Sequence, residues 1–396
     1  MVIIKARQLV SAEKMPWTYG DPVTLINDAA VVVKNGVIID VGQWEDLKRK
    51  YPNEEVWDFG NRLITPGLVD PHTHMLFAGS REDELERKLK GETYEEITKK
   101  GGGIYKTIRE TKQATDKELA SILQRRVEIA AQFGTTTVEI KTGYGLDIDE
   151  ELRLVNIIKK IQVDIDIVTT FLIHIPPPSG REEYVRKILE AIPRVGTTYV
   201  DVFCDSIAFC VEETRAFFKT ATKAGYRLRL HADEFEYIGC SDLVEEFQID
   251  SLDHLLNTPL ENVTKIARSG AVATLLPITI FTLRTPKRPP VEELRRQKVP
   301  IAIGTDFSPN SWCLNMQTAI EQAVYLLGLT PLEAIIAATA NAAYSLRLTD
   351  RGVIKPGKKA DLVIWDVPNY HWLAYELGRN KAWLVIKNGV PLIKTP

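Results

Sequence analysis

The chain has 396 residues, more than an ordinary single domain, so it can bury a large hydrophobic core. Its net charge is -3 at pH 7 with both signs interspersed, which excludes the charge signature of a nucleic-acid or membrane-surface partner. No apolar stretch approaches the length of a membrane span, and the N-terminus lacks the long apolar core of a signal peptide.

The chain begins with a β-rich segment, residues 1–62. Within it, residues 30–42 are typical of two strands joined by the turn dipeptide Asn35-Gly36, which favours a β-hairpin. These strands are too few for a stable sheet of their own, so we expect them to find partners elsewhere in the chain.

Residues 63–348 contain eight short apolar runs that are typical of buried strands. The runs end near His74, Lys141, His174, Cys204, His231, His254, Leu276 and Asp306. Helical patterns separate most of them, and the alternation at intervals of about 20 to 35 residues is the rhythm of β/α units around a parallel sheet. Eight units predict a closed, TIM-like (β/α)8 barrel, whose active site lies at the carboxyl ends of the strands.

The expected helices have apolar residues at helical spacing. In chain order they span residues 81–100, 115–133, 147–161, 181–192, 211–224, 236–247, 259–269, 290–297 and 330–345. Thr115 and Glu118 form a capping box, and Pro331 follows Thr330 at the first position of the last helix.

Residues 349–396 return to a β pattern. Residues 360–365 are typical of a strand, and residues 384–390 are typical of a second hairpin, with Asn388-Gly389 at its turn. We predict that this segment pairs with residues 1–62 in one small β-sandwich domain, which joins the two ends of the barrel.

Four cysteines are present, and no two of them form a Cys-x-x-Cys pair. They are Cys204, Cys210, Cys240 and Cys313. Four are too few for a disulfide framework, so we expect reduced thiols that serve as packing residues in a cytoplasmic protein.

All histidines except His371 close apolar runs. His72 and His74 are two residues apart, so on a strand they project to the same side and present two imidazoles to one point. Together with His231 and Asp306, they form a set typical of a mononuclear metal site with an open coordination position. The set suits one Zn²⁺ or Fe²⁺ ion per chain, and water on such an ion can lose its proton near neutral pH.

Two further residues near these ligands can carry chemistry. Glu234 follows His231 by three residues and is placed to transfer protons, whereas Asp233 is expected to cap the next helix. His254 ends the sixth run, where it would stabilise charge that builds on a carbonyl oxygen or assist proton transfer.

Four other residues have two interpretations each. His174 would contact a ligand or cap a loop, and Tyr144 would contact a ligand or pack its glycine-rich loop. Arg81 would clamp a substrate carboxylate through two hydrogen bonds or lie solvated on a helix. Lys141 would bridge two metals as a carbamate, or it would face a carboxylate or solvent; the fourth run ends without a lysine, which favours a single metal.

The order of these residues, with the barrel and the two-part β-domain, resembles the amidohydrolase superfamily. Five motifs resemble its imidazolonepropionase family: residues 72–82 (HTHMLFAGSRE), 101–104 (GGGI), 139–146 (EIKTGYGL), 231–235 (HADEF) and 304–307 (GTDF). The family continues after the metal aspartate with Asn-Pro-Gly and a small hydroxyl residue, whereas this chain has Ser308-Pro309-Asn310-Ser311.

The resemblance implies hydrolysis of the ring C–N bond of 4-imidazolone-5-propanoate to N-formimidoyl-L-glutamate, in histidine degradation. It matches His72, His74, His231 and Asp306 to metal ligands, and Glu234, His254 and Asp306 to catalytic residues. It implies substrate contacts from Arg81, Tyr144, His174, Glu234, Ser308, Asn310 and Ser311. A small molecule would be the partner, with no nucleic acid or membrane, and we expect a homodimer.

Two other functions are weighed against this one. A mononuclear deaminase that acts on a cyclic amidine, such as cytosine or guanine, would use the same ligands and release ammonia. Arg81 and Tyr144 argue against it, because a neutral base needs no carboxylate clamp. A barrel kept only as an assembly scaffold would have lost metal ligands, and all four are present.

Overall fold

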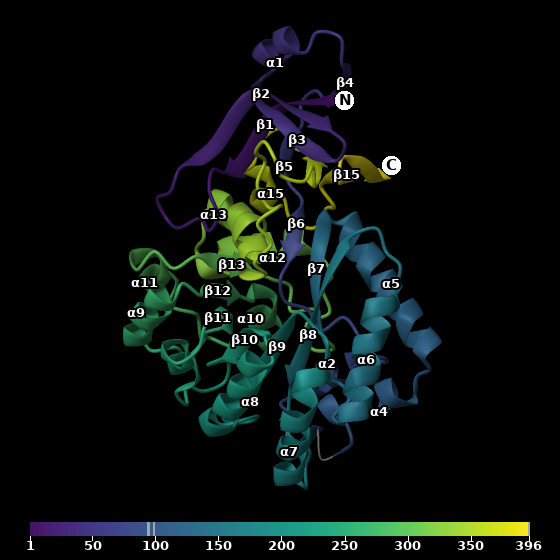
Figure 1. Ribbon diagram of the computed structural model, residues 1–396, viewed down its shortest axis with the longest axis vertical. Helices are drawn as coiled ribbons and strands as arrows, with labels where there is room; N and C mark the ends of the chain where they lie inside the picture. Colours follow the sequence, from purple (N-terminus) through teal and green to yellow (C-terminus); the bar gives the residue numbers. More distant parts are fainter. Residues whose placement is uncertain (93–95, 98–99, 395–396) are drawn as a thin grey trace.

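The computed structural model describes residues 1–92, 96–97 and 100–394. Figure 1 shows two parts: a β-domain at the top, coloured purple and yellow because both chain ends enter it, and a larger α/β part below. The elements keep the labels of Figure 1.

The larger part is a parallel sheet of eight strands in the order β13-β12-β11-β10-β9-β8-β7-β6. The strands are β6 (Leu68–Asp70), β7 (Thr135–Lys141), β8 (Asp166–Ile173), β9 (Tyr199–Cys204), β10 (Arg227–Ala232), β11 (Ile249–His254), β12 (Val272–Leu275) and β13 (Ile301–Ile303). The two edge strands meet just beyond their ends, where the Asp306 N–H donates to the His72 carbonyl at 3.0 Å and the His74 N–H donates to the Phe307 carbonyl at 2.8 Å. The predicted (β/α)8 barrel is confirmed, and its closing seam runs between predicted metal ligands.

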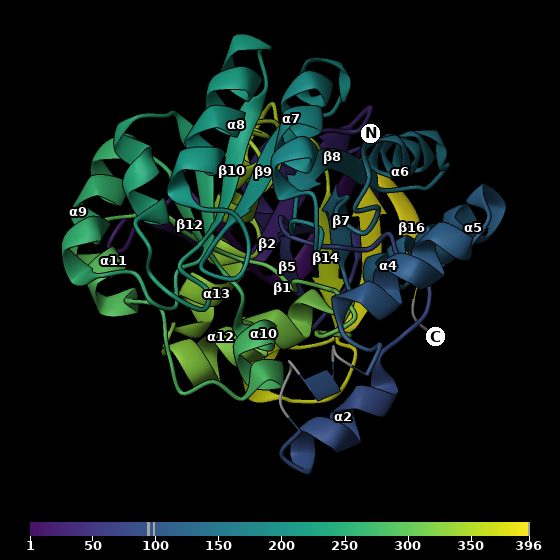
Figure 2. The same cartoon turned by 90° about the horizontal axis from the view of Figure 1, so that it is seen from below.

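Helices surround these strands, as the view of Figure 2 shows. They are α2 (Glu82–Leu89), α4 (Ile104–Gln113), α5 (Asp116–Gln132), α6 (Ile148–Lys160), α7 (Arg181–Ala191), α8 (Val211–Lys223), α9 (Leu260–Ser269), α10 (Pro277–Leu283), α11 (Val291–Arg296), α12 (Met316–Leu327), α13 (Pro331–Ala337) and α14 (Ala340–Ser345), with the 3-10 helix η1 (Ile192–Arg194) after α7. The capping box of Thr115 and Glu118 is present. Within the described ranges, no helix combines the length and apolarity needed to cross a membrane.

Three predicted helices differ from the structure. Residues 236–247 hold only a short 3-10 helix, η2 (Cys240–Glu245), which follows the left-handed Gly239. Residues 330–345 divide into α13 and α14 on either side of Thr339. Of the helix predicted over residues 81–100, α2 forms the first part, and residues 93–95 and 98–99 lie outside the described residues.

Both chain ends form the second sheet, which confirms a β-domain built from the two termini. Its strands are β1 (Val2–Ala12), β2 (Val23–Lys34), β3 (Val37–Gln43), β4 (Glu55–Asp58), β5 (Leu63–Pro66), β14 (Leu362–Trp365), β15 (Ala382–Lys387) and β16 (Val390–Lys394), and the short helices α1 (Trp44–Lys50) and α15 (Trp372–Tyr375) accompany them. The order is β16-β15-β14-β5-β1-β2-β3, with β4 paired to β1. The predicted sandwich is thus one continuous hydrogen-bonded sheet, and residues from its two halves share one hydrophobic core.

Both predicted hairpins are present, and their turns have the expected backbone. Asn35 and Gly36 have φ values of 51° and 78°, and Asn388 and Gly389 have 48° and 75°. Two successive positive φ values are the mark of the type I′ turn, which matches the twist of the flanking strands.

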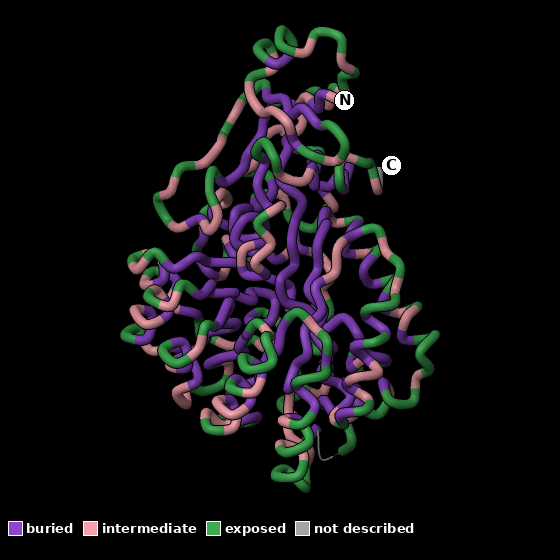
Figure 3. The backbone as a smooth tube through the Cα atoms, viewed as in Figure 1, coloured by how far each residue is buried: buried purple, intermediate pink, exposed green. Residues whose placement is uncertain are grey.

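The junction between the two parts lies at Gly67, so the barrel begins at Leu68 and not at the predicted Leu63. Strand β5 belongs to the β-domain, where Thr65 pairs with Val363 of β14. A Cβ atom at Gly67 would lie 2.3 Å from the Thr136 hydroxyl oxygen, so only glycine fits where β5 passes into β6. This segment is buried throughout (Figure 3), and it carries the chain from the β-domain directly to His72.

Candidate active site

Three buried histidines converge at the mouth of the barrel. Nitrogen atoms of His72, His74 and His231 lie within 4.8 Å of one another. The Oδ1 atom of Asp306 lies 3.2 Å from Nε2 of His74 and 3.5 Å from Nε2 of His72. The structure therefore brings together the four residues predicted as metal ligands.

The unsatisfied nitrogens of this cluster fit a cation. Nε2 of His72 and Nε2 of His231 are buried without a hydrogen-bond partner among the described residues, which is costly unless something occupies the space between them. Burial holds the pKa of His72 well below its usual value, so its ring is neutral and keeps a lone pair. Neutral imidazoles with one carboxylate are a donor set for a divalent metal.

Two carboxylates orient the histidines from behind. The His72 Nδ1 atom lies 2.6 Å from Oδ2 of Asp253, and the His231 Nδ1 atom lies 3.1 Å from Oδ1 of Asp201. A proton on each Nδ1 is therefore donated to a carboxylate, which leaves each Nε2 free to face the shared point.

Lys141 lies between these carboxylates and is fully buried. Its Nζ atom is 2.7 Å from Asp201, 2.9 Å from Glu139 and 3.9 Å from Asp253. Burial lowers the pKa of Lys141, but Asp201 and Glu139 outweigh burial and raise it above the usual value, so the ammonium stays charged. The interpretation that Lys141 faces carboxylates is confirmed, and a carbamate bridge to a second metal is not favoured.

Glu234 and His254 face each other beside the cluster, with Oε2 and Nε2 3.6 Å apart. Burial, helped by the charge of Asp306, raises the pKa of Glu234 well above its usual value, which favours its protonated form. Burial lowers the pKa of His254 to about 3, so its ring is neutral. His254 also has a φ of 78°, a region that side chains with a Cβ adopt rarely and that is found at functional sites.

His174 and Tyr144 form an aromatic wall next to His74. The His174 ring stacks on the His74 ring with centroids 5.5 Å apart, and the Tyr144 ring lies 5.5 Å from the His174 ring. His174 also bonds through Nδ1 to the Gly143 carbonyl at 3.0 Å. Thus His174 both holds the loop and lies in the site, so its two interpretations are compatible.

Arg81 is buried, not solvated, on the loop that leaves β6 and carries His74. Its side chain is nearly inaccessible, and its Nε and Nη1 atoms have no hydrogen-bond partner in the described part of the chain. A buried guanidinium without an acceptor is unfavourable, and a bound carboxylate would satisfy it through paired hydrogen bonds.

The loop after β13 holds the other three predicted contacts. The Ser308 hydroxyl accepts the Ser311 N–H at 3.3 Å, and exposed Asn310 accepts a hydrogen bond from Lys88 of α2 at 3.3 Å. The Ser311 side chain is fully buried, and its hydroxyl lies near those of Thr279 and Thr282. Contact of these residues with a substrate stays a prediction.

Sequence reasoning missed Asp201, Asp253 and Arg229, whose guanidinium lies 3.0 Å from Asp253. A charged residue inside an apolar strand was the available signal, because such a residue needs a partner. Asp233 is not the N-cap of the next helix as predicted, because that helix is η2 and its N-cap is Gly239. The Asp233 carboxylate accepts a hydrogen bond from the Thr258 hydroxyl at 2.6 Å instead.

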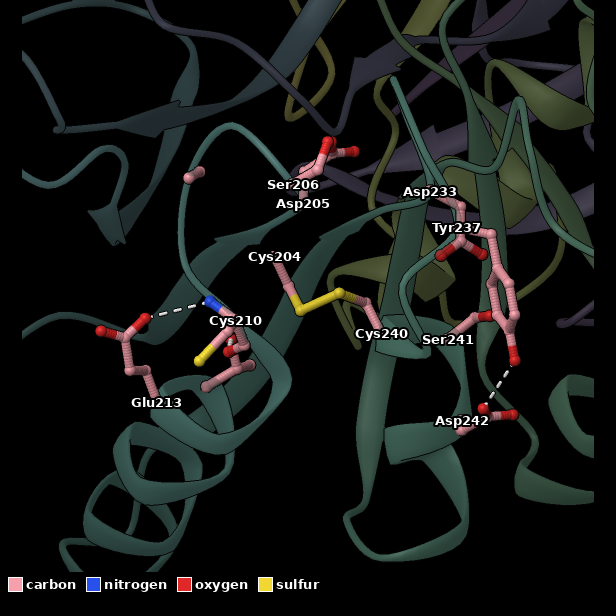
Figure 4. The surroundings of a disulfide bond; sticks show 12 residues. Cys204, Asp205, Ser206, Cys210, Glu213, Asp233, Tyr237, Cys240, Ser241 and Asp242 are labelled. Carbon is pink, nitrogen blue, oxygen red and sulfur yellow. Dashed lines mark hydrogen bonds between the residues drawn. A yellow bond between two sulfur atoms is a disulfide. The ribbon is translucent and has the colours of Figure 1, made fainter.

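Cys204 and Cys240 form a disulfide, so the prediction that all four cysteines are reduced packing thiols is wrong for this pair. Their Cα atoms are 5.8 Å apart, within the range that a disulfide spans. Figure 4 shows the bond between the end of β9 and the start of η2. The carboxylate of Asp205, the residue after Cys204, accepts the Phe235 N–H at 2.9 Å. This hydrogen bond fixes the loop that carries Glu234.

A model described as the amidohydrolase family matches residues 80–393. The imidazolonepropionase of Pyrobaculum arsenaticum is 75% identical over 392 residues, 99% of each chain, and that of Deinococcus radiodurans is 42% identical over 375 residues, 93% of each.

Solved structures share the fold at low sequence identity. Guanine deaminase of E. coli has a TM-score of 0.72 at 15% identity, with all of both chains covered. The zinc complex of atrazine chlorohydrolase from Arthrobacter aurescens has a TM-score of 0.72 at 17% identity, covering 100% of this chain and 95% of the other.

We predict one metal ion per chain, because no second cluster of three such ligand atoms is found in residues 1–92, 96–97 and 100–394. Metal analysis of the purified protein should give one equivalent, and His72→Ala should lower it, since a ligand is lost. His371→Ala, which changes an exposed histidine outside the cluster, is the control. Two equivalents in the parent protein would contradict the prediction.

We predict two free thiols per chain, those of Cys210 and Cys313. Thiol titration of protein denatured without reductant should give two, and titration after reduction should give all four. Four thiols before reduction would show that Cys204 and Cys240 are not joined.

Proposed function

Because the chain belongs to the imidazolonepropionase family of amidohydrolases, we propose that it hydrolyses 4-imidazolone-5-propanoate to N-formimidoyl-L-glutamate in histidine degradation. It is a hydrolase that acts on a C–N bond of a cyclic amide. The observation that carries the choice of substrate is Arg81, a buried side chain whose Nε and Nη1 atoms have no hydrogen-bond partner among the described residues, on the loop that follows His74.

One divalent ion, Zn²⁺ or Fe²⁺, would be held by His72, His74, His231 and Asp306. Such an ion supplies Lewis acidity and lowers the pKa of a water that binds it. The chain's own residues then hold the substrate and move protons.

Water adds across the ring C–N bond: its oxygen bonds to the carbonyl carbon, one proton goes to the ring nitrogen, and the C–N bond breaks. Burial opposes ionisation of Asp306, but the hydrogen bond from His74 favours it, and the pKa of Asp306 lies well below the usual value, so it is a carboxylate that accepts the proton of the attacking water. Protonated Glu234 delivers a proton to the leaving nitrogen. Neutral His254 stabilises the negative charge that builds on the carbonyl oxygen.

Arg81 and Tyr144 would bind the propanoate, and His174 and Glu234 would contact the ring. Ser308, Asn310 and Ser311 are proposed to complete the substrate contacts from the loop after β13. A charge-assisted pair between a planar guanidinium and a carboxylate gives affinity and also fixes the orientation of the carboxylate. The propanoate group would therefore set the position of the substrate ring in the site.

A cytoplasmic location and a homodimer, both expected from the sequence, stay proposals.

Arg81→Met tests the substrate class. It should raise KM for imidazolone propanoate by about 10- to 100-fold, because hydrogen bonds to a charged group are lost. Steady-state kinetics, with the product identified by mass, should show a ring-opened acid and no ammonia. Arg186→Met, which removes an exposed arginine of α7, is the matched control and should be unchanged. Ammonia released from a neutral base, with Arg81→Met fully active, would favour the deaminase function.

His254→Ala should lower kcat by about 10²-fold, because a group that stabilises charge in the transition state is lost. The bound metal should stay at the parent level, since His254 is not among the proposed ligands. Metal content and kcat measured on one preparation separate the two effects, and loss of the metal would mean that His254 is a ligand.

A further inference from the structure

We propose that Thr279 is a positioning residue for Asp306, and that its hydroxyl determines which carboxylate oxygen faces the three histidines. The proposal rests on the proposed function only for the role of Asp306 in hydrolysis. The contacts themselves are independent of the identity of the substrate.

Thr279 and Asp306 come from neighbouring units of the barrel. Thr279 lies in the first turn of α10, just after β12, and Asp306 follows β13, which pairs with β12. The Thr279 hydroxyl donates to Oδ2 of Asp306 at 2.5 Å. The other oxygen, Oδ1, faces Nε2 of His74 and Nε2 of His72. One oxygen of the carboxylate is therefore held by Thr279, and the other faces the histidines.

A small group of hydroxyls backs this contact. Ser311 Oγ lies 3.1 Å from Thr279 Oγ1 and 3.0 Å from Thr282 Oγ1, and the Thr282 hydroxyl donates to the Thr279 carbonyl at 3.2 Å. Each hydroxyl has one proton, and an ionised carboxylate only accepts. The Thr279 proton must therefore point at Asp306, and the Thr279 oxygen is left as an acceptor for Ser311.

Burial and backbone conformation make this bond necessary. The side chains of Thr279, Ser311 and Asp306 are all buried, so water does not readily replace a missing hydroxyl. Asp306 has a φ of 49°, in the left-handed region, so regular strand geometry does not set the direction of its side chain. The Thr279 side chain is β-branched and has few rotamers, which limits the directions in which its hydroxyl can point.

Thr279→Val tests the proposal, because it removes the hydroxyl and keeps the branched shape. The Zn²⁺ dissociation constant, measured by competition with a chromophoric chelator and without substrate, should rise by about 10- to 100-fold, as it does when a group that supports a metal ligand is lost. With the metal saturating, kcat should fall by about tenfold or more while KM changes by about twofold or less, because only an interaction with the reacting groups is lost.

Thr282→Val is the matched control. It removes a hydroxyl of the same helix that also contacts Ser311, but the hydroxyl that donates to the carboxylate of Asp306 is that of Thr279. Thr279→Ser keeps the hydroxyl, so it should avoid the losses expected for Thr279→Val. Both variants should stay within about threefold of the parent in Zn²⁺ affinity and in kcat. Thr279→Ala makes the same test with a smaller side chain if valine unfolds the protein.

A Thr279→Val or Thr279→Ala protein with the parent's Zn²⁺ affinity and kcat would overturn the proposal. Equal losses in Thr282→Val would also overturn it, because the hydroxyls would then serve general packing. If the parent does not act on imidazolone propanoate but the Zn²⁺ affinities follow the expected order, the proposed substrate is wrong and the role of Thr279 is supported.

Discussion

Ionised carboxylates in the interior of a barrel need cations beside them, and this requirement shapes the centre of the protein. Asp201 and Asp253 orient two histidines, and both are fully buried. Lys141 and Arg229 lie against them and are equally buried. Removal of one member of such a group leaves an uncompensated charge inside, which is far more costly than the net stabilisation that the pairs contribute.

This group also fixes the register of the strands. Its members come from β7, β9, β10 and β11, and Arg229 of β10 pairs directly with Asp201 of β9. A shift of one residue in any of these strands would turn its charged side chains to the opposite face. The same shift in β10 would move His231 out of the cluster. The strands must therefore pair in the correct register for the predicted metal ligands to meet.

The sequence predicts where the strands end and that His72, His74 and His231 meet there, because apolar runs mark the strands and histidine is scarce. It does not predict which buried charges meet, because Lys141 finds Asp201 only through the register of the barrel. It also fails at residues 236–247, where apolar spacing indicates a helix but the Asp205 carboxylate takes the Phe235 N–H and Gly239 adopts a left-handed backbone. The Cys204–Cys240 bond forms because that irregular loop brings Cys240 next to Cys204. The spacing of the cysteines in the sequence does not indicate this path of the chain.

The contact between β5 and β14 has a consequence for how the chain folds during synthesis. Strand β5 is continuous with the segment that ends at His72, yet its antiparallel partner, β14, is separated from it in sequence by the whole barrel. Contacts this distant in sequence close late, since the intervening chain must first be ordered. The segment that leads to the first metal ligand is therefore anchored on its β14 side only after the strands of the barrel have been synthesised, and until then the hydrogen-bonding groups of β5 on that side are open to any other extended chain.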